Sequence, residues 1–448
     1  MNTPRRSVNA WILPFEDAPS GTSYQSPTSS YQALITYGVY NYLDMVNICF
    51  ANTLPTSSTT VPTGDGSTYT IELQSANHPG GYTNQDYMNW LIQDAREANP
   101  NIKVLITLGY AANEFTQIFS GAQSQWPAQA ASYANNVVAY LKNYGLNGFD
   151  IDWEAPFSGS TPADQVSLVL TALRTAFDAQ PETYYLTLSP ATAENLKGSF
   201  VNNTVDFLNL QLYSGFTTPD EFTQVGISQS LLAYGAKFES IGNGDTNPYQ
   251  DAQGAQQGMV SGGYGITTQW RLNSGDFQFE QAQQMILYQL VYGVSGATFD
   301  DAPIIGAAGN PLISSMGIRS GDVLDAIQAT NTGSYDGNSV QYQLLQHGGN
   351  GGNPSTFSTP SGDAITEING YTGVWFGWNC VLQITLKTRG GKTFGPFGTM
   401  NNATAKTPFT YAAPSGQSIV AFSGSIVNVP LAGGGATYVI ASLTPSCA

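Results

Sequence analysis

The stretch NGFDIDWE, residues 147–154, constrains the fold more than any other part of this chain. Asp150, Asp152 and Glu154 occupy every second position, and the residues between them are bulky and apolar. Because successive side chains of a β-strand point to opposite faces, this pattern predicts a strand with one apolar and one acidic face. Carboxylates are costly to bury and repel one another. The pattern therefore predicts a chemical site rather than a packed core.

Short apolar runs and longer helical segments alternate over the first part of the chain. Eight runs have the composition of strands: 7–15, 44–53, 102–110, 147–154, 184–191, 205–216, 230–238 and 295–303. The segments between them repeat apolar residues three and four apart, as amphipathic helices do. This alternation predicts an α/β fold, a (β/α)8 TIM barrel, whose chemistry lies at the C-terminal ends of the strands. Residues 240–268, rich in Gly, Gln and Asn, are expected to form a long loop at the barrel mouth.

The texture of the chain changes after residue 310, where it begins to repeat itself. SGDVLDAI (320–327), SGDAITEI (361–368) and SGQSIVAF (415–422) share a turn followed by paired apolar residues. Three such repeats predict an all-β domain with pseudo-threefold symmetry, either a β-prism or a β-trefoil. We therefore expect a barrel domain over residues 1–305 and an all-β domain over residues 306–448.

Composition excludes several classes of partner and cofactor. The formal charge of −17 disfavours nucleic acid and anionic membrane surfaces, because both attract clustered Lys and Arg. The first apolar run is short and broken by Pro14, so we expect no integral membrane segment and no classical signal peptide. Release to the extracellular space by another route is the favoured expectation, with a cytoplasmic inclusion as the alternative. The spacing of His and Cys predicts no metal, and we expect no cofactor.

The acidic strand has a predictable protonation pattern. Same-face residues on a strand lie roughly 6–7 Å apart, so Asp152 and Glu154 can share a hydrogen bond while Asp150 lies one layer deeper. Ionising all three is unfavourable, which predicts one shared proton and a raised pKa for Glu154, the outermost group. A carboxylic acid of this kind can protonate a glycosidic oxygen near neutral pH.

NGFDIDWE resembles the DGxDxDxE signature of family 18 glycoside hydrolases, the chitinases and endo-β-N-acetylglucosaminidases, with Asn147 in place of the leading Asp. The resemblance implies retaining hydrolysis of β-1,4-linked N-acetylglucosamine, in which the substrate's own acetamido oxygen attacks the anomeric carbon. It implies that Glu154 protonates the leaving oxygen, that Asp152 orients the acetamide, and that Asp150 holds Asp152 in its working state.

The same resemblance implies further substrate contacts. Tyr213, with Gln211 beside it, would hydrogen-bond the acetamide carbonyl, and Gly109 matches the glycines that follow the third strand. The predicted eighth strand has Phe299 and Asp300 where the family usually places a tryptophan, which makes Asp300 a candidate contact and leaves the stacking surface to other aromatic residues. The candidates for that surface are Trp11, Tyr110, Trp270 and Tyr249.

Three C-terminal segments, LLQHGGNGG, CVLQITLKTRGGKTFGPFG and QSIVAFSGS, resemble jacalin-related lectins, which are β-prisms. The resemblance covers about 312–448 and favours a prism over a trefoil. It implies sugar binding by the backbone of Gly348 and Gly349 and by a terminal loop in which Thr437 takes the place of an aspartate. A turn-forming role alone is the alternative for the glycines.

Three functions fit these observations. The first is a hydrolase of N-acetylglucosamine glycans, either chitin or the N-glycan core, with a carbohydrate-binding domain. The second is a chitinase-like, insecticidal binding protein with little turnover whose partners are glycosylated cell-surface receptors. The third is a storage or inclusion protein. The intact acidic row favours the first, whereas Asp300 and Thr437, both departures from their families, favour the second. The sequence carries no signal for an oligomeric state.

Overall fold

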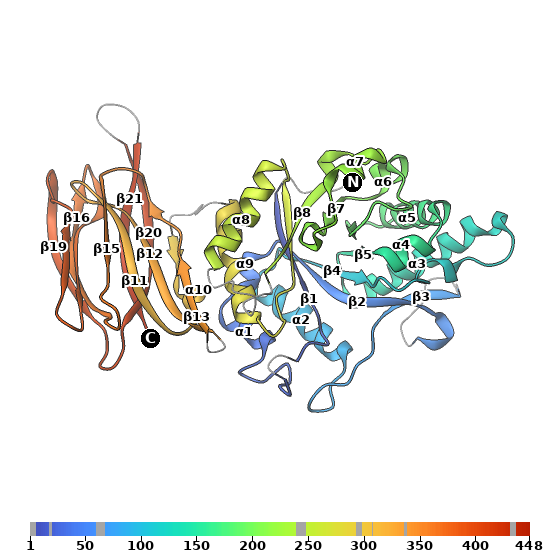
Figure 1. Ribbon diagram of the computed structural model, residues 1–448, viewed down its shortest axis with the longest axis horizontal. Coiled ribbons are helices and arrows are strands. Elements are labelled where there is room, and N and C mark those ends of the chain that lie inside the picture. The colour runs from blue at the N-terminus through green and yellow to red at the C-terminus, as the bar shows by residue number, and fades with distance from the viewer. Residues whose placement is uncertain are drawn as a thin grey trace. The chain divides into compact units, whose positions relative to one another are not determined.

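The computed structural model describes residues 6–17, 20–59, 68–238, 248–292, 298–306, 308–335, 338–430 and 436–448. The chain divides into two compact units. One comprises Met1–Glu239 and Ala255–Phe277, and the other comprises Ser240–Gly254 and Gln278–Ala448. Figure 1 shows a region of mixed helices and strands, coloured blue to yellow, and a region of strands, coloured orange to red.

Eight parallel strands form a closed barrel in the first unit. Around the barrel they are β1 (Ser7–Ile12), β2 (Met45–Pro55), β4 (Lys103–Leu108), β5 (Gly148–Trp153), β6 (Tyr185–Pro190), β7 (Phe207–Leu210), β8 (Leu232–Lys237) and β9 (Ile266–Trp270). β1 pairs with both β2 and β9, which closes the ring. β3 (Tyr69–Leu73) pairs with β2 in antiparallel fashion. The predicted TIM barrel is confirmed.

Helices lie outside the strands (Figure 1). The α-helices are α1 (Ser30–Thr36), α2 (Asn84–Ala98), α3 (Trp126–Tyr144), α4 (Ala155–Ser160), α5 (Ala163–Asp178), α6 (Gly198–Thr204), α7 (Pro219–Gln224), α8 (Pro248–Ser261), α9 (Phe277–Tyr292) and α10 (Ala302–Ile305), with short 3-10 helices at 39–42, 56–58, 116–118, 123–125, 212–214 and 229–231. Sequence chemistry sets their ends. Thr83 and Asp86 form a capping box at the start of α2, and Gly145, at φ 66°, ends α3.

One of the eight predicted strands is wrong. Within 295–303 the structure has the short strand β10 (Thr298–Asp300), which pairs with β20 (Ile419–Pro430) in the second unit, and the start of helix α10. The barrel is closed instead by β9, which begins at the end of the segment 240–268 that was expected to be a loop; that segment also holds helix α8. The sequence ITTQW conceals this strand because three of its five residues are polar, although all three are fully buried. The segment 298–300 therefore belongs with the C-terminal sheets.

Side chains alternate along the barrel strands as the sequence predicts. At the N-terminal end, an apolar cluster fills the interior: Met45, Leu105, Phe207, Ala233 and Ile266, with Tyr185 against it. Trp153 of β5 packs on Phe157 of α4, with ring centroids 5.0 Å apart, so the apolar face of the acidic strand meets the helices. The acids therefore lie on the inner face of the barrel.

The C-terminal strands form three antiparallel sheets. They are β10–β20–β21 (Ala436–Cys447), then β13 (Asn338–Gln343), β12 (Leu324–Tyr335), β11 (Gly309–Ser320) and β15 (Asn353–Ser358) with β14 (His347–Gly348) on β12, and then β18 (Thr393–Phe397), β17 (Trp378–Thr388), β16 (Ile365–Trp375) and β19 (Ala403–Ala412). Each repeat of the sequence begins a strand in a different sheet: Leu324 begins β12, Ile365 begins β16 and Ile419 begins β20. The all-β prediction is confirmed, and the three repeats are distributed over three sheets.

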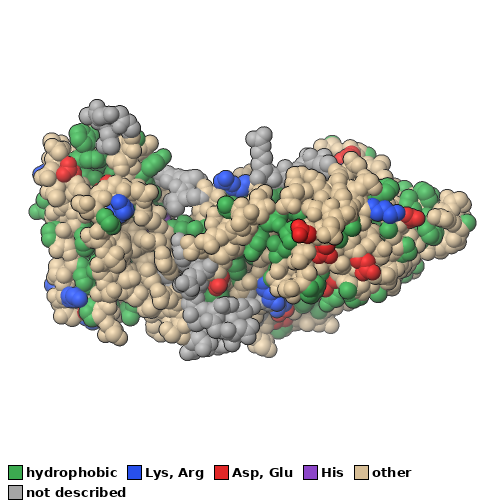
Figure 2. All heavy atoms as spheres, turned by 45° about the horizontal axis from the view of Figure 1, so that its top comes forward, with side chains coloured by type: hydrophobic (Ala, Val, Ile, Leu, Met, Phe, Trp, Pro, Cys, Tyr) green, Lys and Arg blue, Asp and Glu red, His purple; other side chains and the backbone are tan. Residues whose placement is uncertain are grey.

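The described residues offer no metal or membrane feature. Among them, no helix is long and apolar enough to cross a membrane, and no group of three or more His, Cys, Asp or Glu could hold a metal ion. Cys49, Cys380 and Cys447 are free thiols. Figure 2 shows scattered charged side chains on a largely uncharged surface, in keeping with a chain in which 10% of residues are charged.

Candidate active site

The acidic row occupies the inner face of β5 and the residue that follows it. Asp150 is fully buried, Asp152 is 6% exposed, and Glu154 is the N-cap residue of α4, at the rim of the barrel. The row therefore runs from the interior to the C-terminal end of the strand, the end at which such barrels place their chemistry.

Asp150 is surrounded by side-chain donors. Thr187 donates to Oδ1 over 2.6 Å, Thr107 donates to Oδ2 over 3.1 Å, and the Ser189 hydroxyl lies 3.0 and 2.9 Å from the two oxygens. The indole of Trp11 makes a further hydrogen bond to Asp150. Burial raises the pKa of Asp150, and these donors oppose the rise because they stabilise the anion.

A single amide bridges the two outer acids. Nε2 of Gln211 donates to Asp152 Oδ1 over 3.0 Å and to Glu154 Oε1 over 3.1 Å, and also to the Ser189 carbonyl. Burial, followed by the charges of Glu154 and Asp150, raises the pKa of Asp152 well above its usual range. The proton shared at the outer end of the row is therefore favoured on Asp152 at rest. That Glu154 takes up this proton, as the sequence predicts, stays a prediction.

These groups line a cavity of about 200 Å³ at the mouth of the barrel. Its wall consists of Trp11, Phe50, Tyr110, Asp152, Glu154, Ser189, Gln211, Tyr213 and Trp270. The rings of Trp11 and Trp270 lie 5.8 Å apart in an edge-to-face arrangement, and Phe50 lies 5.9 Å from Trp270. Carboxylates on one side and aromatic faces on the other are the features expected of a sugar subsite, since a pyranose ring has both polar edges and apolar faces.

The structure gathers most of the predicted residues here. Trp11, Tyr110, Gln211 and Tyr213 line the cavity with the acids, and Gly109 lies behind it, where an added Cβ would be 3.4 Å from Phe50. The side chain of Tyr249 lies outside the described residues.

The assignment of Asp300 to the site is wrong. Asp300 lies on β10, paired with Ser423 of β20, and its carboxylate accepts a hydrogen bond from Ala302 N. The inferred loss of the family's tryptophan is wrong as well, because the closing strand β9 ends in Trp270, which lines the cavity. The prediction failed because it rested on the wrong eighth strand.

The sequence analysis missed Phe50 and Ser189. Phe50 follows Cys49 near the end of a strongly apolar strand, where its neighbours hide it. Ser189 could have been found, because it ends the strand YLTLSP with a polar side chain at the same parity as Thr187.

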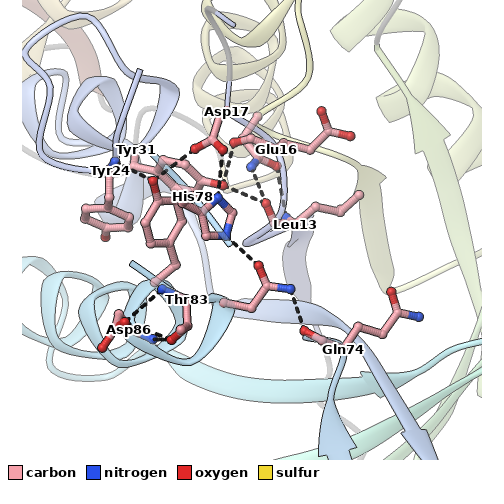
Figure 3. A network of polar contacts seen from close by, with 12 residues as sticks. Leu13, Glu16, Asp17, Tyr24, Tyr31, Gln74, His78, Thr83 and Asp86 are labelled. Carbon is pink, nitrogen blue, oxygen red and sulfur yellow. Dashed lines mark hydrogen bonds and ion pairs between the residues drawn. The ribbon is translucent and has the colours of Figure 1, made fainter. Parts of the chain in front are cut away.

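The loop after β1 is fixed by a buried histidine (Figure 3). His78 Nδ1 lies 2.7 Å from Asp17 Oδ2, its Nε2 lies 2.5 Å from Asn84 Oδ1, and its ring stacks on Tyr87 at 3.8 Å. Asn84 Nδ2 donates to the Gln74 carbonyl, which fixes the orientation of the amide. Both ring nitrogens of His78 therefore face side-chain oxygen atoms, which hold the ring in one orientation.

This loop also contacts the ends of the two strands that carry Trp11 and Trp270. The Tyr31 hydroxyl donates to the carbonyls of Leu13 and Glu16, two residues labelled beside it in Figure 3. The Glu16 carboxylate forms an ion pair with Arg271, whose guanidinium lies 5.9 Å from the centre of the Trp270 ring. The position of the cavity's tryptophan wall thus depends on contacts made well outside the cavity.

A second candidate site lies in the C-terminal unit. The glycine loop at 348–352 closes around Asp325, which is 5% exposed: an added Cβ at Gly351 would be 2.3 Å from Asp325 Oδ1, and one at Gly352 would be 2.4 Å from Oδ2. Thr437 is adjacent, with its hydroxyl 3.0 Å from the same Gly351 position. Burial raises the pKa of Asp325, and the Gly321 amide opposes the rise.

The glycine loop is held in shape from outside. Arg319 donates to the carbonyls of Gly351, Asn350 and Gly352, and Gln346 donates to Gly349 O. The predicted residues Gly348, Gly349 and Thr437 are therefore brought together, and Asp325, a carboxylate that was not predicted there, lies among them. The signal was available in the repeats, where the other two copies have Thr366 and Val420 at this position.

Comparison with known families follows the division of the chain. The model of the glycosyl hydrolases family 18 matches residues 20–291, and that of the jacalin-like lectin domain matches residues 289–429. Because the first match covers more than half of the chain, this protein belongs to family 18 of the glycosyl hydrolases, with a jacalin-like lectin domain after the barrel.

Several curated chitinases are similar in sequence. Chitinase A1 of Niallia circulans is 27% identical over 185 residues, which is 37% of this chain and 25% of that protein. Chitinase 1 of Aphanocladium album is 30% identical over 128 residues, 26% of this chain and 29% of that protein. The match thus spans about a quarter to a third of these relatives' length.

Solved lectin structures also match. The galactose-binding lectin from champedak is 25% identical with a TM-score of 0.26, covering 34% of this chain and 99% of that chain. Malaysian banana lectin is 27% identical with a TM-score of 0.23, covering 34% of this chain and 92% of that chain.

Proposed function

We propose that this protein is a retaining glycosidase that cleaves β-1,4-linked N-acetylglucosamine glycans with the help of the substrate's acetamido group. The observation that carries the proposal is the bridge from Gln211 to both Asp152 and Glu154 at one wall of an aromatic-lined cavity. Carboxylates arranged in this way can deliver one proton and stabilise one positive charge within the same subsite.

The proposed chemistry divides the work among the row. The proton that Asp152 holds at rest passes to Glu154 when the substrate's acetamide N–H binds to Asp152. Glu154, at the rim, then protonates the glycosidic oxygen as the bond to the anomeric carbon breaks. The acetamido carbonyl oxygen attacks that carbon, and Asp152 holds the acetamide N–H and balances the charge of the oxazolinium ion. A water molecule then attacks the anomeric carbon while Glu154, now a carboxylate, takes a proton from it. This attack opens the oxazolinium ring, and the sugar keeps its original anomeric configuration. Tyr213 is the proposed donor to the acetamido oxygen.

The aromatic wall supports turnover rather than binding alone. The binding-protein alternative drew support from a tryptophan believed absent, and Trp270 removes that argument because it ends the closing strand inside the cavity. The matches to chitinases from bacteria, fungi and a plant point the same way. Chitin or its oligosaccharides are the proposed substrates, and the N-glycan core is the second candidate.

The lectin-like unit is proposed to attach the enzyme to glycans. Asp325 offers two acceptor oxygens, and the loop at 348–352 offers backbone amides at positions where no side chain blocks a hydroxyl. A carbohydrate-binding module would raise the local concentration of polymeric substrate at the barrel. Glycosylated surfaces are its proposed partners. Release outside the cell, where such surfaces are found, stays part of the proposal.

The test is fluorophore release from the 4-methylumbelliferyl glycosides of chitobiose and chitotriose, measured for the wild type and Glu154→Gln. Glu194→Gln, at an exposed acid in the same region, is the matched control. We expect turnover by the wild type and the control, and its loss in Glu154→Gln. A folded wild type without turnover on these glycosides, on chitin and on N-glycans would instead establish the binding-protein alternative.

A further inference from the structure

A hydrogen-bonded chain runs from Asp150 across the inside of the barrel. Asn209 Nδ2 on β7 lies 3.3 Å from Ser189 Oγ, and Asn209 Oδ1 lies 2.5 Å from the Thr268 hydroxyl on β9. Asn9 Nδ2 on β1 lies 3.3 Å from that hydroxyl, and Asn9 Oδ1 lies 2.5 Å from Ser7 Oγ. All of these residues are at most 2% exposed. The chain therefore continues, without solvent, to the opposite end of the barrel from the cavity.

The packing allows the chain to cross β8. Thr268 is in register with Gly235, and Asn209 is in register with Ala233, so the strand between them presents only small residues. Gly235 cannot be enlarged, because a Cβ there would lie 2.0 Å from the Leu210 carbonyl oxygen. The polar layer is not hydrogen-bonded throughout: within the described part of the chain, neither polar side-chain atom of Asn47, on the neighbouring β2, has a partner.

Donor chemistry gives the chain one direction. The Ser189 hydroxyl has a single hydrogen, and an ionised Asp150 needs it, so Ser189 must accept from Asn209 Nδ2. Asn209 Oδ1 then faces Thr268, which must donate, and Thr268 must accept from Asn9 Nδ2. Asn9 Oδ1 in turn accepts from Ser7. Every donor thus points toward Asp150, and such aligned bonds polarise one another.

The hydrogen bonds of the chain are expected to run in the opposite direction when Asp150 is protonated and neutral. A protonated Asp150 can donate to Ser189, whose hydrogen is then free to turn away, and both amides and the Thr268 hydroxyl can reverse. We propose that Asn209 and Thr268 are positioning residues that fix the Ser189 hydroxyl and so hold Asp150 as the anion during turnover. This rests on the proposed glycosidase function, for which the shared proton must be held by Asp152 and Glu154.

Two adjacent threonines of β9 provide a matched test. Thr268→Val removes the link in the chain with little change of shape. Thr267→Val is the control, because Thr267 is equally buried and its hydroxyl has no partner among the residues that the structure describes. Thr268→Ser restores a hydroxyl and should restore the wild-type behaviour. We measure kcat and KM on chitobiose umbelliferyl glycoside as a function of pH.

Loss of the chain should raise the pH at which Asp150 becomes an anion. In Thr268→Val the acidic limb of kcat is therefore expected to move to higher pH by about 0.5–1 unit, with KM and the alkaline limb unchanged. Thr267→Val and Thr268→Ser should keep the wild-type limb. An acidic limb at the same pH in Thr268→Val and Thr267→Val would overturn the proposal, since a merely structural bond would not distinguish them.

A measurement without turnover separates this proposal from the proposed function. Burial already raises the pKa of Asp150, so the native state holds its proton more tightly than the unfolded chain. Removing the chain raises that pKa further, and the added loss of stability is absent at low pH and appears as pH rises through it. Urea unfolding should show a deficit of Thr268→Val against Thr267→Val that grows with pH. A stability deficit that did not change with pH would overturn the role proposed for the hydrogen-bonded chain, even if the wild type proved inactive.

Discussion

The carboxylates proposed to act in the two units are buried in different ways. In the barrel, Asp150 is held by hydroxyl and indole groups, and Gln211 bridges its neighbours, so side chains make the site. In the C-terminal unit, Asp325 is enclosed by Gly351 and Gly352, so backbone makes it. The difference predicts different sensitivities: the barrel site depends on which atoms each side chain carries, whereas the lectin-like site depends on the absence of side chains.

The largest effect is expected at Asp152 of the barrel. Asp152→Asn keeps the shape but removes the carboxylate that would balance the oxazolinium ion, so kcat should fall about 10²- to 10³-fold. The variant also cannot share a proton with Glu154, so the shape of the kcat–pH profile should change. Asp164→Asn, at an exposed ion pair with Lys197 on the same barrel, is the control. A mutant with wild-type kcat and an unchanged profile would remove Asp152 from the mechanism.

Glu114 separates burial from function. It is 2% exposed, accepts a hydrogen bond from Thr53 N, and does not line the cavity. Burial raises its pKa to about 7, against the opposing effect of Thr53. The folded state therefore binds this proton more tightly than the unfolded chain, and the stability it contributes is present below the unfolded pKa and lost as pH rises through 7.

Glu114→Gln should abolish that dependence. Relative to the mutant, the wild type should lose up to roughly 3 kcal/mol of unfolding free energy between pH ~4.5 and ~7.5, measured by urea denaturation. Glu182→Gln, at an exposed position, serves as the control. If the wild type and Glu114→Gln kept a constant difference over this range, burial would not be what perturbs carboxyls in this barrel, and the same reasoning for Asp150 would weaken.

The contrast between the sites also explains what the sequence could predict. In a site built from side chains on one strand, the functional residues recur in the sequence with a period of two. Asp150, Asp152 and Glu154 were therefore found directly. Strand β9 was not recognised, because Thr267, Thr268 and Gln269 are buried without being apolar. A site built from backbone is marked in the sequence only by its glycines. Thr437 was expected to take the place of an aspartate, whereas the fold encloses Asp325, a residue of the first repeat, with the glycine loop of the same repeat. Neither strand pairing across the barrel nor contact between repeats is written in local composition.

A methyl group at Gly351 should damage the backbone-built site. Gly351→Ala would place a Cβ 2.3 Å from Asp325 Oδ1, so the loop must shift and glycan affinity should fall at least about tenfold, ~1.4 kcal/mol. Gly317→Ala is the control, because its nearest neighbour would be 3.8 Å away. An array of mannose-, galactose- and N-acetylglucosamine-terminated glycans, followed by calorimetry on the best ligand, measures the effect. Equal affinity in both variants would argue against this loop as the binding site.

The two histidines of the chain offer the finest comparison between the units. Each is buried beside an aspartate and stacked on a ring, His78 on Tyr87 and His347 on Phe299 at 3.9 Å. Their partners differ: both nitrogens of His78 face side-chain oxygens, whereas His347 has Asp301 at Nε2, 2.8 Å away, and no partner at Nδ1 among the described residues.

Partner number should therefore set how each ring is held. In ¹⁵N-histidine-labelled protein, long-range ¹H–¹⁵N spectra should show both nitrogens of His78 in hydrogen bonds, and Nε2 alone in His347. His347→Gln assigns the two sets of signals by removing one. A nitrogen of His78 without a hydrogen bond would mean that Asn84 has turned away, contrary to the orientation that the Gln74 carbonyl imposes. A hydrogen bond at His347 Nδ1 would contradict the structure, because this atom has no partner among the described residues. The expected pattern would show that the barrel holds its histidine at both ring nitrogens, whereas the lectin-like unit holds its histidine at one.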